Sequence, residues 1–261
     1  MEIFDRSAPM PGSADCAMVR IDPMTAIPRD EERAVVREHI LSLAVNGRAP
    51  EQLVCTPSEL PALAAGHLLC GGMVRAAADI RSISVSADGC RAAVKTAAAA
   101  PARRQKMVPT TGCPPAGLDG YEPLPGDFSW EPRWVYELAR IFGEGAPLYR
   151  ATHGIHSCFL MQDGAVRFCC EDIGRHNALD KAVGRAMIEG LDLSRCVLFS
   201  SGRIPADMLE KAVRARVPAL ISSAVPTEQA VVLARRYHVV LICSARHDSM
   251  NVFSDKSIWR R

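Results

Sequence analysis

Hydrophobic residues in the second half of the chain fall into two alternating kinds of segment. Residues 196–200, 219–222 and 239–243 are short and almost wholly apolar, which is typical of strands buried on both faces of a sheet. Residues 206–216 and 227–237 lie between them with helical spacing, and they are long enough to serve as crossover connections. The pattern therefore predicts an α/β fold in which the three strands are parallel.

The segments before these strands also have a regular period. Residues 157–162 and 165–170 predict a hairpin that turns at Asp163-Gly164. A stripe with helical spacing follows and predicts a long helix that begins near His176; its members are Leu179, Ala182, Val183, Ala186 and Met187. Residues 130–142 predict another helix, since apolar side chains recur on one side.

The first half is less regular. Residues 35–45 and 48–55 predict a hairpin around Asn46-Gly47, a helix follows from Pro57 and stops at Gly71-Gly72, and two strands flank Asp88-Gly89. We expect three units: an irregular leader over 1–34, a smaller β-rich part over 35–127 that ends in a mobile loop at 97–127, and an α/β domain over 128–261.

Composition narrows the classes of protein that the chain can represent. Its 261 residues are 48% hydrophobic and carry a net charge of +2, so no overall charge favours a nucleic acid. No apolar run approaches the ~20 residues of a membrane helix, and no signal-peptide pattern is present, so we expect a cytoplasmic protein without a membrane segment. The ten cysteines lack Cys-x-x-Cys spacing, and we expect most of them to be packing residues.

A candidate anion site begins at the start of the long helix, in Gly174-Arg175-His176-Asn177. Free backbone N–H groups at a helix start, with an arginine beside them, can hold a phosphate, although simple helix capping would also account for these residues. Three further segments follow predicted strands, namely Ser200 to Arg203, Ser222 to Ala224 and Ser244 to Ser249. Because ligands bind at the carboxyl ends of parallel strands, we expect all four segments to converge there.

Two histidines and one cysteine complete the candidate residues. His153 and His156 precede the predicted hairpin, and we interpret them as structural or substrate-contacting side chains, because the zinc deaminase signature of His-x-Glu with Pro-Cys-x-x-Cys is absent. Cys113 differs from the other cysteines because it lies in a polar loop rich in glycine and proline, downstream of Arg103, Arg104 and Lys106. An exposed thiolate in such a setting can carry sulfur as a persulfide, whereas an accidental surface cysteine is the alternative.

These residues resemble the FdhD family of formate dehydrogenase accessory proteins. The similarity runs from about Val35 to Phe253 and is most specific in the Gly-Arg-His-Asn-Ala-Leu-Asp-Lys run that begins at Gly174. Four departures are visible: Ala116 replaces the second cysteine of a Cys-Gly-x-Cys-Gly motif, His153 and His247 replace glycines, and Gly71 replaces an acidic residue.

The resemblance implies a cytidine-deaminase-like three-layer α/β domain with a smaller β-rich N-terminal part, a homodimer, and a sulfurtransferase with Cys113 as the sulfur-carrying residue. It implies that the bound substrate is the molybdenum cofactor, bis(molybdopterin guanine dinucleotide), and that the partners are a cysteine desulfurase and a molybdenum-dependent formate dehydrogenase. We expect no structural metal, and we expect neither a nucleic acid nor a membrane among the partners. The residues expected to contact the cofactor are His156, Gly174, Arg175, His176, Asn177, Ser201, Gly202, Arg203, Ser244, Ala245, Arg246, His247, Asp248 and Ser249.

Two hypotheses remain open. In the first, Cys113 accepts sulfur from the desulfurase and passes it to the cofactor before insertion into formate dehydrogenase. In the second, favoured by Ala116, the protein is a cofactor-binding chaperone that has lost sulfur transfer.

Overall fold

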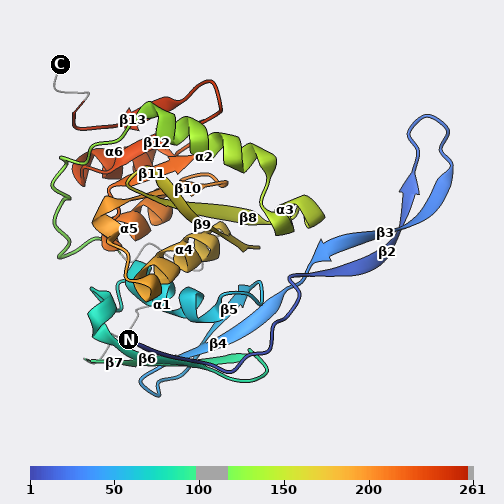
Figure 1. Cartoon of the computed structure of the whole chain (residues 1–261), viewed down its shortest axis with the longest axis horizontal. Coiled ribbons are helices and arrows are strands. Elements are labelled where there is room, and N and C mark those ends of the chain that lie inside the picture. Colours follow the sequence, from blue (N-terminus) through green and yellow to red (C-terminus); the bar gives the residue numbers. More distant parts are fainter. Residues whose placement is uncertain (98–116, 258–261) are drawn as a thin grey trace.

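The computed structural model describes residues 1–97 and 117–257, which form two sheets, the helices around them and a projecting hairpin (Figure 1). The larger sheet has the strand order β13-β12-β11-β10-β8-β9. Its strands are β8 His156–Gln162, β9 Ala165–Asp172, β10 Cys196–Ser200, β11 Ala219–Ser222, β12 Val240–Cys243 and β13 Asn251–Ser254. The parallel pairing of β10, β11 and β12 is confirmed, and β8 and β13 run antiparallel to the strands beside them.

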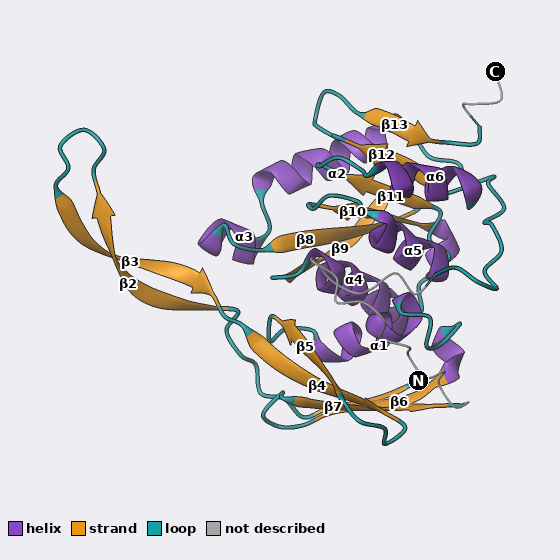
Figure 2. Cartoon of the chain, turned by 180° about the vertical axis from the view of Figure 1, so that it is seen from behind, coloured by secondary structure: helices purple, strands orange, loops and turns teal. Residues whose placement is uncertain are grey.

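Helices cover both faces of this sheet (Figure 2). On one face, α2 Pro132–Glu144 packs Val135 and Leu138 against Phe159 and Phe199. The opposite face is covered by α4 Arg175–Glu189, α5 Ala206–Arg214 and α6 Glu228–Arg236. The three-layer α/β arrangement expected for the second half of the chain is therefore confirmed, because each apolar strand buries side chains on both sides.

The smaller sheet has the order β1-β6-β7-β4-β5. Its strands are β1 Glu2–Asp5, β4 His39–Val45, β5 Glu51–Cys55, β6 Ile80–Val85 and β7 Arg91–Thr96. Side chains alternate between buried and exposed along β7, so one face packs inward on α1 Leu60–Cys70 and the other faces outward. The predicted hairpin at Asn46-Gly47 is confirmed, and both residues have positive φ angles, 51° and 73°, as a tight hairpin turn requires.

Helices α1 and α4 join the two sheets. A Cβ atom on Gly66 would lie 1.8 Å from the carbonyl oxygen of Asp180, and one on Gly184 would lie 1.9 Å from the carbonyl oxygen of Ala62. Only glycine permits backbones to approach so closely. The main core extends through both parts of the chain, so the β-rich part and the α/β domain pack as one body.

The expectation of an irregular leader over residues 1–34 is wrong. Strand β1 pairs with β6 in the smaller sheet, and β2 Ser13–Ile21 pairs with β3 Pro28–Val36 in a long two-stranded hairpin. We call residues 13–36 the arm; it projects from the body beyond α3 Pro147–Thr152 (Figures 1 and 2). Sequence analysis does not predict these strands because neither face of the hairpin is buried in a core. Only a strand with one buried face shows hydrophobic and polar residues in alternation.

The short connections complete the description. Two 3₁₀ turns, Ala77–Asp79 and Leu193–Arg195, precede β6 and β10. The expected strand over residues 35–45 is divided between β3 and β4, with Arg37 and Glu38 at the break. No helix in the described ranges is both long and apolar enough to cross a lipid bilayer.

Candidate functional site

The carboxyl ends of β10, β11 and β12 meet at one edge of the larger sheet. The Ser222 hydroxyl donates to the Gly202 carbonyl at 2.7 Å, and the Ala245 N–H donates to the Ser222 carbonyl at 3.0 Å. The Ser244 N–H donates to the Ala224 carbonyl at 2.8 Å. The convergence predicted for these three segments is therefore confirmed, since hydrogen bonds tie each one to the next.

The start of α4 brings the fourth segment to the same edge. A Cβ atom on Gly202 would lie 2.8 Å from Arg175 Cδ and 3.4 Å from His156 Cε1. His156 Nδ1 lies 3.0 Å from the Ser201 hydroxyl, which also accepts the Ser157 N–H at 3.1 Å. Gly202 thus allows an arginine side chain and an imidazole to approach the loop after β10. We call Arg175, His156, His176, Gly202 and Arg203 the cationic edge.

His176 is held by a residue that sequence analysis missed. Its Nε2 lies 2.9 Å from Oδ2 of Asp207, in the first turn of α5, and both side chains are largely buried. Burial alone would raise the pKa of Asp207, but the hydrogen bond and charge of His176, together with the charge of Arg175, lower it below its ordinary value. Acidic residues are common in the first turn of a helix because they interact favourably with the positive end of the helix dipole, so no sequence signal distinguishes Asp207.

The electrostatic environment of the cationic edge favours a bound anion. Burial lowers the pKa of Arg175; the charge of Asp207 opposes this change, and the smaller effect of the Arg203 charge adds to it. The pKa of His156 is also lowered, by burial and then by the positive charges of Arg175 and His176. The charged forms of both groups are thus disfavoured, mainly by burial. A phosphate placed beside them would stabilise the charged forms and accept hydrogen bonds from the guanidinium groups.

The segment from Ser244 to Ser249 forms a turn at the same edge. The Arg246 guanidinium donates to the carbonyls of Ser223 and Ala245, and its N–H donates to the Ser249 carbonyl at 2.7 Å. The Ser249 hydroxyl donates to Asp248 Oδ1 at 3.1 Å. Arg246, His247, Asp248 and Ser249 are exposed, whereas Ala245 is buried. The structure therefore places this segment beside the cationic edge with Arg246 bound to backbone carbonyls.

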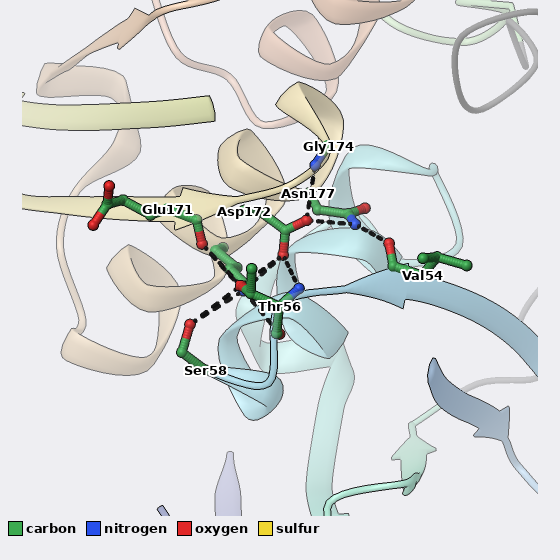
Figure 3. Close-up of polar contacts among 8 residues, drawn as sticks. Val54, Thr56, Ser58, Glu171, Asp172, Gly174 and Asn177 are labelled. Atoms are coloured by element: carbon green, nitrogen blue, oxygen red, sulfur yellow. Dashed lines mark hydrogen bonds and ion pairs between the residues drawn. The ribbon is translucent and has the colours of Figure 1, made fainter. Parts of the chain in front are cut away.

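Two of the expected contact residues, Gly174 and Asn177, take part in a hydrogen-bond network around the buried carboxylate of Asp172 (Figure 3). The Asn177 amide donates to the Val54 carbonyl at 2.8 Å and to Asp172 Oδ1 at 3.0 Å, and the Gly174 N–H donates to the same oxygen at 3.0 Å. Asp172 also accepts from the Thr56 N–H at 3.0 Å. Their observed role is to join β9 and α4 to the end of β5, a structural task that the sequence did not reveal.

A lysine completes this network. Lys181 Nζ lies 2.7 Å from Asp172 Oδ2, and both side chains are fully buried. The ammonium also donates to the Thr56 hydroxyl at 2.7 Å and to the Glu171 carbonyl at 3.3 Å. Buried ions persist only when they are paired and hydrogen-bonded. Lys181, the last residue of the specific sequence run, and Asp172, two residues before the run begins, thus hold the two parts of the protein together.

A second buried network crosses α4 and α5. Lys211 Nζ donates to both carboxylate oxygens of Asp180, at 2.7 and 2.6 Å, and His67 Nδ1 lies 3.4 Å from Asp180. Burial would raise the pKa of Asp180, but Lys211 and His67 together hold it well below its ordinary value. The carboxylate is therefore ionised in the folded protein at neutral pH.

Cys113, the expected sulfur-carrying residue, lies outside the described residues. Burial is the main cause that raises the pKa of seven other cysteines, which are Cys55, Cys70, Cys158, Cys169, Cys170, Cys196 and Cys243. Cys16 and Cys90 are exposed.

His153, which caps α3, is exposed and has a φ of 53° at a position where the resemblance implies glycine. Among the described residues, no group of three His, Cys, Asp or Glu side chains could hold a metal.

The fold and the site define a two-sheet α/β protein with a cationic edge at the ends of its parallel strands. The model of the FdhD/NarQ family matches residues 36–259, and the chain belongs to this family. The sulfur carrier protein FdhD of Wolinella succinogenes is 30% identical over 237 residues, which cover 86% of this chain and 82% of that protein. The protein of the same name from Chromobacterium violaceum is 32% identical over 229 residues, 81% of this chain and 85% of that one.

A solved structure is similar over almost the whole chain. The crystal structure of a protein described as a formate dehydrogenase accessory protein, from Desulfotalea psychrophila, has a TM-score of 0.80 and 27% sequence identity. The match covers 95% of this chain and 99% of that one. The family resemblance seen in the sequence is therefore confirmed, together with the α/β class of the fold.

Proposed function

We propose that this protein carries sulfur for the maturation of a molybdenum-dependent formate dehydrogenase. In this proposal, Cys113 accepts sulfur from a cysteine desulfurase as a persulfide and hands it to bis(molybdopterin guanine dinucleotide). The cationic edge holds the phosphates of that substrate. The observation that carries the proposal is the cluster of Arg175, His156 and Arg203 around Gly202, in a family whose curated relatives are named sulfur carrier proteins.

The chemistry of the cationic edge suits a dinucleotide. Guanidinium groups bind phosphate oxygens in pairs, and the absent side chain of Gly202 leaves room for Arg175 to lie against the loop after β10, next to the exposed Arg203. The turn from Ser244 to Ser249 lies beside it and supplies exposed polar groups for the remainder of the ligand. His176 is fixed in orientation by Asp207, so its ring is held in place next to Arg175.

The described residue that follows Cys113 most closely, Gly117, is held against α5. Its carbonyl accepts from Arg214 Nη2 at 2.6 Å, and its backbone hydrogen-bonds to Glu210, one helical turn beyond Asp207. Four residues of extended chain span up to ~14 Å, whereas one helical turn rises ~5.4 Å. Chain length therefore allows the Cys113 thiol to reach the cationic edge from this anchor.

The first chemical step is thiol exchange. The Cys113 thiolate attacks the terminal sulfur of the desulfurase persulfide; a new S–S bond forms, the old one breaks, and the desulfurase cysteine leaves as a thiolate. The seven cysteines whose pKa is raised by burial are unsuited to this step, because the thiol form is a poor nucleophile. Cys16 and Cys90 are the exposed competitors among the described residues, and they serve as controls.

The second candidate function is a chaperone that binds the same cofactor and has lost sulfur transfer. Ala116 favours it, because the second thiol of the family motif is absent and no disulfide can close within that motif. Both functions use the cationic edge, so binding alone does not distinguish them. Formation of a persulfide on Cys113 is expected only for the sulfur carrier and therefore does distinguish them.

The test is intact-mass spectrometry after incubation with a cysteine desulfurase and cysteine. The wild type, Cys16→Ser and Cys90→Ser should each gain about 32 Da, the mass of one sulfur atom, and Cys113→Ser should not. In parallel, Arg203→Ala should weaken the binding of guanosine diphosphate. Binding that survives in a protein whose Cys113 never gains sulfur would support the chaperone and end the carrier proposal.

A further inference from the structure

The smaller sheet is covered by helices on one side only. In Figure 2 the described helices lie on the side of α1, whereas both faces of the larger sheet are covered. The outward-pointing positions of β1, β4, β5, β6 and β7 form the opposite side, which we call the outer face. The described part of the chain therefore leaves one broad sheet face open to a partner.

Large apolar side chains lie exposed on the outer face. Ile40 on β4 and Val54 on β5 are directly opposite each other in the pairing register and are 56% and 49% exposed. Phe4 on β1, at the other edge of the sheet, is 50% exposed. A sheet with one solvated face ordinarily places polar side chains there, and exposed apolar patches mark sites of interaction. The outer face thus resembles a surface that another protein covers.

The middle of the outer face is positively charged and hollow. Arg91 and Lys95 both point outward from β7, in alternation with buried residues. Among the described strand residues, Glu2 on the edge strand β1 is the one carboxylate of this face. A depression of about 550 Å³ is lined by Arg6 and Arg91, and small side chains complete its lining, namely those of Ser42, Ala44, Ser84 and Ala93. The outer face therefore complements a surface that combines carboxylates with apolar side chains.

The strand that carries these cations leads along the chain to the proposed sulfur-carrying residue. β7 ends at Thr96, and the connection that follows it holds Cys113. The sequence of that connection adds three cations before Cys113, at Arg103, Arg104 and Lys106. A protein that contacts Arg91 and Lys95 therefore touches the strand from which this connection begins.

We propose that the outer face is the docking surface for the cysteine desulfurase, which presents to it an acidic surface with apolar side chains. This inference rests on the proposed function and names the surface that receives the sulfur donor. Carboxylates of the desulfurase pair with Arg91 and Lys95, and its apolar side chains cover Ile40 and Val54. Five strands at ~4.8 Å spacing make a face of roughly 20 by 20 Å. A contact of this size suits a transient encounter, which a donor that leaves after each transfer requires.

The test compares the rates at which Cys113 gains sulfur from two donors, followed by intact-mass spectrometry. With the desulfurase and cysteine, Arg91→Glu with Lys95→Glu should slow the gain about tenfold, because the reversed charges repel an acidic surface. Ile40→Ser with Val54→Ser should also slow it, since apolar contact is lost. Added salt should slow the wild type and speed the charge-reversed variant, because screening weakens attraction and repulsion alike.

The second donor is cysteine persulfide, which has no protein surface. The Cys113 thiolate attacks its terminal sulfur, a new S–S bond forms, and cysteine leaves as a thiolate. Both outer-face variants should react with this donor at the rate of the wild type. This result would show that the substitutions leave the folded chain and the Cys113 thiol intact.

The matched control is Arg29→Glu with Arg33→Glu on the arm. These exposed arginines share one side of β3, whereas Asp30 and Glu32 lie on the other side. They have the same spacing along a strand as Arg91 and Lys95, so the control makes an equal change of charge away from the outer face. It should gain sulfur from the desulfurase at the rate of the wild type.

The failure of this inference differs from the failure of the proposed function. If the wild type gains sulfur from the desulfurase and both outer-face variants keep its rate, the docking surface is wrong and sulfur transfer stands. Variants that are equally slow with cysteine persulfide would also overturn the docking surface. So would a change from the mass of two chains to that of one, measured by light scattering, because a second copy then covers this face. If the wild type gains no sulfur from the desulfurase, the proposed function fails, and this inference fails with it.

Discussion

His176 Nε2 and Asp207 Oδ2 lie 2.9 Å apart and connect the first turn of α4 to the first turn of α5. The two residues are 31 positions apart, and each helix begins just after a strand of the same sheet. The carboxylate therefore fixes the imidazole at the cationic edge without occupying it. This relationship is the basis of the first prediction.

Asp207→Asn should weaken the binding of guanosine diphosphate, because a neutral amide is a poorer acceptor for His176 than a carboxylate. The loss of a charge-assisted hydrogen bond of this kind corresponds to ~1–2 kcal/mol, or about tenfold in affinity. Isothermal titration calorimetry measures it. The control is Glu228→Gln, which removes an exposed carboxylate from the equivalent turn of α6 and should leave affinity unchanged. Equal affinities for both variants would contradict the prediction.

Gly202→Ala should displace Arg175. The new methyl group would lie 2.8 Å from Arg175 Cδ and 3.1 Å from its Cβ, so the arginine must move from the loop. We expect guanosine diphosphate affinity to fall about tenfold, with a smaller effect on stability. Gly143→Ala, where nothing lies within 4 Å of the added atom, is the matched control. An unchanged affinity in Gly202→Ala would show that Arg175 does not contact the ligand.

Lys181→Met should be strongly destabilising, because it leaves the fully buried Asp172 carboxylate without its cation. Breaking a buried pair from one side costs about 3–5 kcal/mol of unfolding free energy. The double variant Asp172→Asn with Lys181→Met should recover part of that loss, since no charge remains buried. Urea unfolding provides the measurement, and Arg195→Met, in an exposed pair with Asp163, should cost less than ~1 kcal/mol. A double variant as unstable as the single one would refute this interpretation of the network.

The lowered pKa of His156 predicts a pH dependence. Because the folded protein disfavours the protonated form, its stability is complete above the ordinary histidine pKa of ~6.5 and declines as pH falls from there through the lower pKa of the folded state. A bound anion offsets the charges of Arg175 and His176 and favours protonation of His156. Binding of sulfate, which does not titrate in this range, should therefore strengthen as pH falls from 7.5 to 5.5.

The measurement is the rise in melting temperature caused by sulfate at each pH. His156→Asn should remove most of the pH dependence, whereas His153→Asn, which changes an exposed histidine outside the cationic edge, should retain it. If both variants keep the wild-type dependence, His156 does not contribute to the anion site.

The apolar runs determined the parallel strands β10, β11 and β12, because a strand buried on both faces must be hydrophobic along its whole length. The turn pairs Asn46-Gly47 and Asp163-Gly164 likewise determined two hairpins, since few residues tolerate positive φ. The same local rules failed for residues 1–34, where strands without a buried face have no diagnostic period.

The sequence by itself also determined that Arg175, Arg203 and the turn after β12 would approach one another, since strand order and direction follow from the pattern. Only the tertiary structure decided the role of each side chain. Asp207 serves His176, Gly174 and Asn177 serve a buried junction, and the arm separates its charges by face. The physical reason is that hydrogen-bond partners and burial depend on contacts between residues far apart in the chain, and a local pattern contains no record of those contacts.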